Sequence, residues 1–159
     1  ADNADAANKN KGDGQSAYNA ARRAQSLAIC NYIKGTHEST EPSRVLVIGD
    51  LNAYQQEDPI DALRANGLVD LHEGLGNSAP SESFGLDYTF VYYAQCGSLD
   101  HAFATESLAA DVTGVSIWHI NADEPRFMDY NQEYNPATVY AADPYRSSDH
   151  DPVLIGIRK

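Results

Sequence analysis

Acidic, amide and imidazole side chains gather in four short segments that together could act on a phosphate ester. Cleaving a phosphodiester in line requires an oriented water and hydrogen-bond donors for the phosphate as its charge builds up. Carboxylates can orient the water or hold a divalent cation, and an amide can donate to the phosphate. The segments are Gly49-Asp50-Leu51-Asn52, Ser98-Leu99-Asp100-His101, Asn121-Ala122-Asp123-Glu124 and Ser147-Ser148-Asp149-His150-Asp151-Pro152.

Residues 44–50 predict a buried strand that ends in Gly49-Asp50, and Asn52 follows two residues after Asp50. Two residues apart on an extended chain, their side chains can face the same way. Polar groups delivered to the end of a buried strand are costly unless they find partners. The pair therefore indicates either a phosphate-cleaving site or an Asx turn that closes the strand.

Asp149 and His150 directly precede the last predicted strand, and Pro152 holds the residue before it in extended geometry. A histidine that performs acid–base chemistry needs a carboxylate on its other ring nitrogen to set its tautomer. Asp100 is the candidate partner for His150, while Asp149 could hold the cation. The alternatives are a turn with a surface histidine and, for Asp100, a residue that only ends a strand pairing.

The elements that must position these groups alternate along the chain, which indicates one α+β domain. Residues 1–15 predict a flexible loop, and the remaining domain spans residues 16–159. A helix is expected from Ser16, as N-cap, to Gly35, as C-cap. A short helix follows over residues 58–66, opened by Pro59. Strands are expected at 87–94 and 99–104, joined by a hairpin turn at 95–98, and then at 115–120 and 152–158.

Composition narrows the function classes. The 159 residues carry 23 Asp and Glu against 11 Lys and Arg, a net charge of −12, which is unlike the basic surface of most DNA-binding proteins. The acidity either keeps the protein in solution or, in part, holds a cation. No apolar run approaches the ~20 residues of a membrane span. Cys30 and Cys96 form no zinc-type pattern and are either two thiols or one disulfide.

In this order, the segments resemble the signature of the endonuclease/exonuclease/phosphatase (DNase I-like) superfamily. That signature is a Gly-Asp-Phe-Asn-like strand end, a Leu-Asp-aromatic strand and a terminal Ser-Asp-His-x-Pro-Val. Over nearly the whole chain the sequence is also similar to bacterial secreted extracellular nucleases of the ExeM/NucH type. That similarity is carried by residues 12–15, 49–54, 57–59, 120–125, 129–131 and 141–150.

The resemblance implies a role for each candidate residue. Asp149 would ligate the catalytic metal, and Asp50 would position the attacking water or join the metal site. Asn52 would bind the phosphate. His150 would act in acid–base catalysis, oriented by Asp100. His101 stands where the family has an aromatic residue and could compete for the hydrogen bonds of Asp100, and Arg146 could meet a phosphate or join a loop salt bridge.

The resemblance also implies a fold, a cofactor and a substrate. The expected fold is half of a four-layer α/β/β/α sandwich, a mixed sheet flanked by helices. The expected activity is that of a secreted, Mg²⁺-dependent hydrolase of DNA, with Ca²⁺ or Mn²⁺ as alternative metals and RNA as alternative substrate.

The family's first half carries a metal-binding glutamate and another histidine. We therefore expect this chain to be the C-terminal half and to be inactive or very weak alone. The missing N-terminal half, or self-association, would cover its exposed sheet face. The alternative functions are a phosphatase acting on inositol or phospholipid phosphate and a non-catalytic extracellular binding module.

Overall fold

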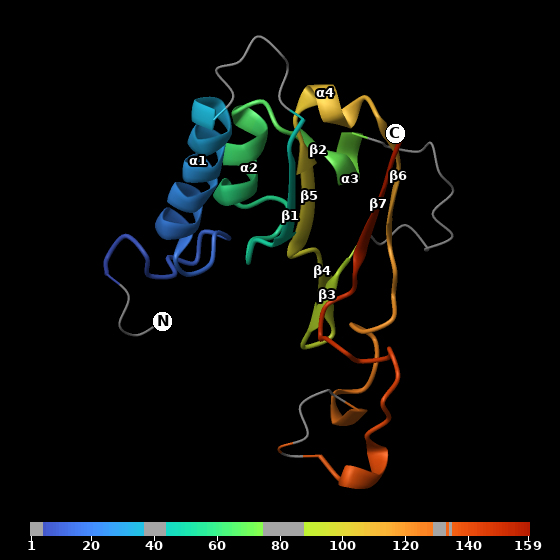
Figure 1. Cartoon of the computed structure of the whole chain (residues 1–159). Helices are drawn as coiled ribbons and strands as arrows, with labels where there is room; N and C mark the ends of the chain where they lie inside the picture. The colour runs from blue at the N-terminus through green and yellow to red at the C-terminus, as the bar shows by residue number, and fades with distance from the viewer. Residues whose placement is uncertain (1–4, 37–43, 75–87, 129–132, 134) are drawn as a thin grey trace.

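Two helices lie side by side against one face of a small sheet (Figure 1). The computed structural model describes residues 5–36, 44–74, 88–128, 133 and 135–159. The helices are α1 (Asn19–Thr36) and α2 (Asp58–Ala65), and the latter has a proline in its first turn as expected. Cys30 and Ile33 of α1 meet Ile60 and Leu63 of α2 over Phe103, which forms the first hydrophobic cluster of the core.

The sheet has the strand order β1-β5-β2, with antiparallel pairing throughout. Its strands are β1 (Leu46–Asp50), β5 (Asp100–Ala104) and β2 (Val69–Asp70). Because side chains alternate along a strand, Phe103 of β5 faces the helices while Ala102 and Ala104 face the other side. The register of β1 on β5 sets Asp50 directly opposite Asp100, so the two candidate carboxylates meet at one end of the sheet.

The other face of the sheet packs a second hydrophobic cluster. It joins the short helices α3 (Leu71–Gly74) and α4 (Glu106–Ala109) to the strand pair β6 (Val112–Ile117) and β7 (Val153–Ile157). The hairpin β3 (Phe90–Tyr92) and β4 (Gln95–Gly97) lies below this layer. The 3-10 turns η1 (Arg126–Met128) and η2 (Ala137–Val139) lie in a lower lobe (Figure 1).

Several expectations about these elements are wrong. The first helix begins at Asn19 and continues past Gly35, while Ser16 has a left-handed backbone (φ 60°) and donates to Glu57 instead of capping. The hairpin turn lies at residues 93–94, so β3 pairs with residues 95–97 and not with 99–104. The strand we expected to be buried lies at an edge of its sheet, which leaves Ile48 61% exposed.

The expected mixed sheet is, over the part of the chain that the structure describes, three separate antiparallel sheets. The architecture is nevertheless an assembly of helices and strands, as the sequence indicated. Residues 1–4 of the expected loop, residue 87 of the expected strand and the segment 129–131 lie outside the described residues. The four-layer sandwich therefore stays a prediction.

The two cysteines are both free thiols. Cys30 is buried on α1, where desolvation raises the pKa of its thiol, and Cys96 is exposed on β4. This resolves the open choice between two thiols and one disulfide in favour of thiols. Among the described helices, none combines the length and the apolar character that crossing a membrane would require.

Candidate active site

The centre of the site is a hydrogen bond between His150 and Asp100. Nδ1 of His150 lies 2.6 Å from Oδ2 of Asp100, and the two side chains are only 20% and 17% exposed. An ionised carboxylate can only accept, so the neutral imidazole must carry its proton on Nδ1. This leaves Nε2 as an acceptor, the state that a general base requires.

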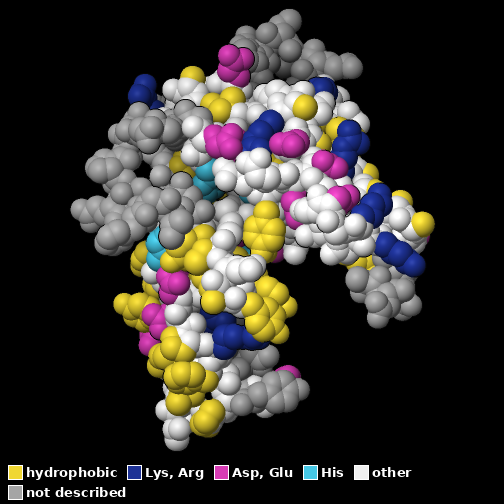
Figure 2. Space-filling view, turned by 180° about the vertical axis from the view of Figure 1, so that it is seen from behind, with side chains coloured by type: hydrophobic (Ala, Val, Ile, Leu, Met, Phe, Trp, Pro, Cys, Tyr) yellow, Lys and Arg dark blue, Asp and Glu magenta, His cyan; other side chains and the backbone are white. Residues whose placement is uncertain are grey.

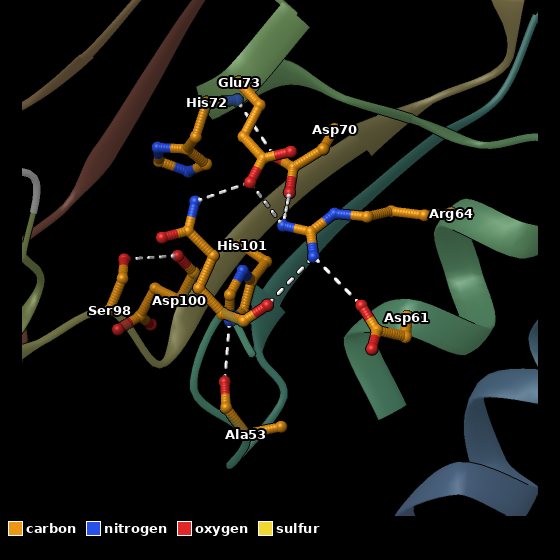
Figure 3. Close-up of polar contacts among 10 residues, drawn as sticks. Ala53, Asp61, Arg64, Asp70, His72, Glu73, Ser98, Asp100 and His101 are labelled. Carbon is orange, nitrogen blue, oxygen red and sulfur yellow. Dashed lines mark hydrogen bonds and ion pairs between the residues drawn. The ribbon is translucent and has the colours of Figure 1, made fainter. Parts of the chain in front are cut away.

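Asp100 is held in place from the neighbouring hairpin. The hydroxyl of Thr89, a fully buried side chain, accepts hydrogen bonds from the backbone N–H groups of Leu99 and Asp100, each at 3.1 Å. Ser98 donates to the carbonyl of Asp100 at 3.3 Å (Figure 3). The start of β5 is therefore fixed by side chains as well as by the sheet.

His150 is held on its other side by β3. Its backbone forms an antiparallel bridge with Phe90, and the two rings lie with centroids 4.6 Å apart and planes inclined by 31°. The side-chain amide of Asn121 donates to the carbonyl of His150 at 2.7 Å. The imidazole thus lies between an aromatic ring and a carboxylate, an arrangement that limits its rotation.

Asp151 is the main residue of this region that sequence reasoning missed. It is 2% exposed, and its Oδ1 accepts from the backbone N–H groups of residues 120, 121 and 122 at 3.0, 2.8 and 2.9 Å. Its Oδ2 lies 2.8 Å from Nδ1 of His119. Asp151 therefore fastens the loop that carries Asn121 to the segment that carries His150. The available signal was an acid between the site histidine and the proline that begins the last strand.

Asp50 and Asn52 form an Asx turn, one of the two alternatives left open by the sequence. Oδ1 of Asp50 accepts from the backbone N–H of Asn52 at 2.7 Å, and Oδ2 accepts from its side-chain amide at 3.1 Å. Asn52 has a left-handed backbone (φ 48°), which asparagine tolerates better than most residues. Both side chains are exposed to solvent, so the turn leaves them free to meet a ligand.

The loop that follows Asn52 is fastened by groups from three elements. Arg22 of α1, which is ion-paired with the buried Glu57, donates to the carbonyl of Asn52. His101 of β5 donates from Nε2 to the carbonyl of Ala53 at 2.7 Å. Arg64 of α2 donates to the carbonyl of residue 55 at 2.9 Å (Figure 3).

The expected competition between His101 and Asp100 is wrong. Successive side chains of a strand point to opposite faces, so His101 of β5 lies buried, 2% exposed, and bonds Ala53. Desolvation is the main cause that lowers the pKa of His101, and the neutral ring suits this environment. His101 is therefore a structural residue of the core.

Asp149 lies in a different setting from Asp50. It lines a surface pocket of about 150 Å³ together with Phe90, Tyr93 and Arg146, whereas Asp50 does not line this pocket. The structure thus brings Asp50, Asn52, Asp100 and His150 to one end of β1 and β5. Asp149 is next to His150 in the chain. The ring of His150 packs on Phe90, which lines the same pocket as Asp149.

Two further candidates have structural partners. Arg146 is buried and donates to the carbonyl of Asn121 at 2.9 Å. Asp123 accepts from the hydroxyl of Tyr88, and this bond is the largest cause that raises the pKa of Tyr88. The segment 121–124 therefore shapes the wall of the site.

The donor set suits a hard divalent cation. Among the described residues, no three His, Cys, Asp or Glu side chains are grouped as a metal cage. Mg²⁺ commonly keeps several waters and is bound by one or two carboxylates together with substrate phosphates. Asp50 and Asp100 also face each other across β1 and β5, where like charges are unfavourable unless a cation offsets them.

Comparison with known proteins agrees with this geometry. A model of the Endonuclease/Exonuclease/phosphatase family matches residues 7–150, a range that contains every candidate site residue. A search of curated proteins and a search of solved structures found no match. The chain therefore belongs to the endonuclease/exonuclease/phosphatase family.

Proposed function

We propose that the protein is a divalent-metal-dependent nuclease that hydrolyses phosphodiester bonds of DNA. Members of its family act on phosphodiesters and phosphate esters. The observation that carries the proposal is the 2.6 Å hydrogen bond between His150 and Asp100, at the end of the strand pair that also presents Asp50 and Asn52. An oriented base beside a carboxylate–amide pair supplies a proton acceptor and a hydrogen-bond donor for in-line attack on a phosphate.

Each side chain has a role that follows from its contacts. His150, held by Asp100 through Nδ1, exchanges a proton at Nε2 with the water or the leaving oxygen. Asn52 uses one amide hydrogen on Asp50 and keeps the other for a phosphate oxygen. Asp50 accepts one hydrogen bond on each oxygen and keeps lone pairs that can orient the attacking water.

The metal would be held by carboxylates of this region. Asp149 and Asp50 are the candidate ligands, with Mg²⁺ as the expected ion and Ca²⁺ or Mn²⁺ as alternatives. When bound, the ion supplies positive charge to the phosphate oxygens. The positions of Asp100 and His150 do not depend on it, because their contacts are made by protein groups.

The finer assignments rest on the resemblance. Similarity to nucleases of the ExeM/NucH type supports a secreted enzyme that cleaves extracellular DNA. It also supports an upstream half that supplies a glutamate ligand and packs on this one. The exposed apolar side chains of the edge strands, Ile48, Leu154 and Ile157, suit such packing.

A substrate panel tests the proposal. The complete protein is incubated with supercoiled plasmid, single-stranded RNA or an inositol phosphate, in Mg²⁺ and in EDTA. The proposal predicts nicked plasmid in Mg²⁺ and none in EDTA. Phosphate release from the inositol phosphate with intact plasmid would instead establish a phosphatase. Turnover of DNA at the same rate in EDTA would contradict metal dependence.

A further inference from the structure

A pocket of about 150 Å³ opens beside His150, and of the described residues that line it only Asp149 has a role in the chemistry proposed above. It lies between the β3–β4 hairpin and the lower lobe, and its lining includes Phe90, Tyr92, Tyr93 and Arg126. Figure 2 shows hydrophobic side chains gathered over this lower part of the molecule, next to Lys or Arg side chains. Phe90 connects the pocket to the site, because its ring packs on His150.

The hairpin presents its tyrosines to solvent. Tyr92 is 54% exposed and Tyr93 is 84% exposed, although large aromatic side chains usually bury most of their surface. Their rings meet edge to face with centroids 4.6 Å apart, and Tyr92 stacks near Phe90 at 6.1 Å. Tyr93 has a left-handed backbone (φ 47°), which is strained for a bulky residue. The turn thus holds an aromatic face outward at a conformational cost.

The size of the pocket suits one planar ring. An apolar cavity of about 150 Å³ accommodates benzene, so the volume here matches a single aromatic ring. Aromatic rings prefer offset or edge-to-face contacts at centroid distances of about 4.5–7 Å. A nucleobase could therefore stack on the exposed face of Tyr92 or Tyr93.

The lining of the pocket is more positively charged than the chain as a whole. The protein carries a net charge of −12, which repels a polyanion, yet Arg126 and Arg146 both line this pocket. Arg126 is exposed, and Arg146 is buried with one N–H group on the carbonyl of Asn121. Among the described residues of this lining, Asp149 is the one acid, against the two arginines. The exposed guanidinium group of Arg126 beside stacked aromatics matches a base with its phosphate.

We propose that this pocket binds one nucleotide of a single-stranded nucleic acid, next to the phosphate that is cleaved at His150. The base stacks on Tyr92 and Tyr93, and the backbone phosphate faces Arg126. An unpaired base is required, from a single strand or from a locally opened stretch of a plasmid duplex, because the faces of paired bases are covered by their neighbours. The inference rests on the proposed nuclease function and names its substrate form.

Oligonucleotide binding by the complete protein tests this inference. Fluorescein-labelled oligothymidylate, oligouridylate and a duplex of equal length are titrated in EDTA, where binding is separated from cleavage. The variants are Tyr92→Ala/Tyr93→Ala and Arg126→Gln. The matched controls are Tyr32→Ala and Arg23→Gln, which change exposed residues of α1.

Stacking contributes about 1–3 kcal/mol per base, so the double tyrosine variant should weaken oligothymidylate binding about 5- to 150-fold. Arg126→Gln should lower the dependence of log affinity on log salt by roughly 0.7. The controls should bind as the wild type does. Similar losses with oligouridylate would show that the pocket accepts either sugar.

Unchanged affinity in the tyrosine variant, no measurable binding by the wild type, or tighter binding of the duplex would each overturn the inference. Failure of the nuclease proposal gives a different pattern. In that case the wild type binds oligothymidylate through the tyrosines but cleaves no nucleic acid in Mg²⁺.

Discussion

Replacing Asp100 by asparagine isolates the contact on which the proposed chemistry depends. The change keeps the shape of the side chain and removes the charge that accepts the Nδ1 proton of His150 at 2.6 Å. A hydrogen bond to a charged group contributes about 1.5–3 kcal/mol. Each 1.4 kcal/mol is a factor of about ten in rate, so kcat should fall roughly 10- to 150-fold. Because both side chains are mostly buried, added salt should screen little of this effect.

The assay is the initial rate of plasmid nicking in saturating Mg²⁺, with kcat and KM determined separately. Asp100 does not contact the substrate in this account, so kcat should fall while KM changes little. Glu106→Gln, which neutralises an exposed acid on α4, is the matched control and should leave both constants unchanged.

A double variant decides whether Asp100 acts through His150. If it does, adding Asp100→Asn to His150→Ala should cost little beyond the loss from His150→Ala alone. Two losses that multiply in full would refute the coupling. Retention of most of the wild-type kcat by Asp100→Asn would show that Asp100 does not orient the catalytic histidine.

Two further predictions concern the residues that hold the site together. Asp151→Asn leaves buried N–H groups with a poorer acceptor, so it should lower the free energy of unfolding in urea by about 3 kcal/mol. The control is Asp111→Asn, which removes one partner of an exposed ion pair. A loss in Asp151→Asn no larger than in this control would contradict the prediction. Burial lowers the pKa of His101 in the folded protein. As the pH falls, this histidine therefore takes up its proton at a higher pH in the unfolded chain than in the folded one. The stabilising contribution of neutral His101 is thus complete above pH ~6.5 and is lost as the pH falls below it. The urea midpoint should therefore drop more steeply from pH 8 to 5 in the wild type than in His101→Gln, and equal slopes would count against the assignment.

The chemistry of the site was more predictable than the packing around it. A histidine that needs a carboxylate and a strand that begins with Asp100 suffice to predict their pairing, which the 2.6 Å contact confirms. Asp50 and Asn52 were predicted to act together, and the structure shows that the Asx turn and an exposed polar pair are compatible. Local residue types carry this information, because the groups lie at strand ends that the sequence marks.

The burial of individual residues depended on partners distant in the chain. Asp151 is buried because it accepts from backbone N–H groups some 30 residues away, and its place between His150 and Pro152 in the sequence does not reveal those partners. Ile48 belongs to an apolar run but is exposed because β1 forms an edge of its sheet. The expected hairpin turn at 95–98 is displaced because the actual turn uses Tyr93 and Ala94 with positive φ, residue types that do not mark a turn in a sequence.

The proposed function depends above all on proton transfer by His150 in the cleavage of a phosphodiester. The most direct test compares wild type and His150→Ala for plasmid nicking in Mg²⁺, with circular dichroism to verify that both are folded. If His150 transfers the proton, kcat should fall about 10²–10⁴-fold in the folded variant. A folded His150→Ala protein that nicks DNA at the wild-type rate would contradict this role.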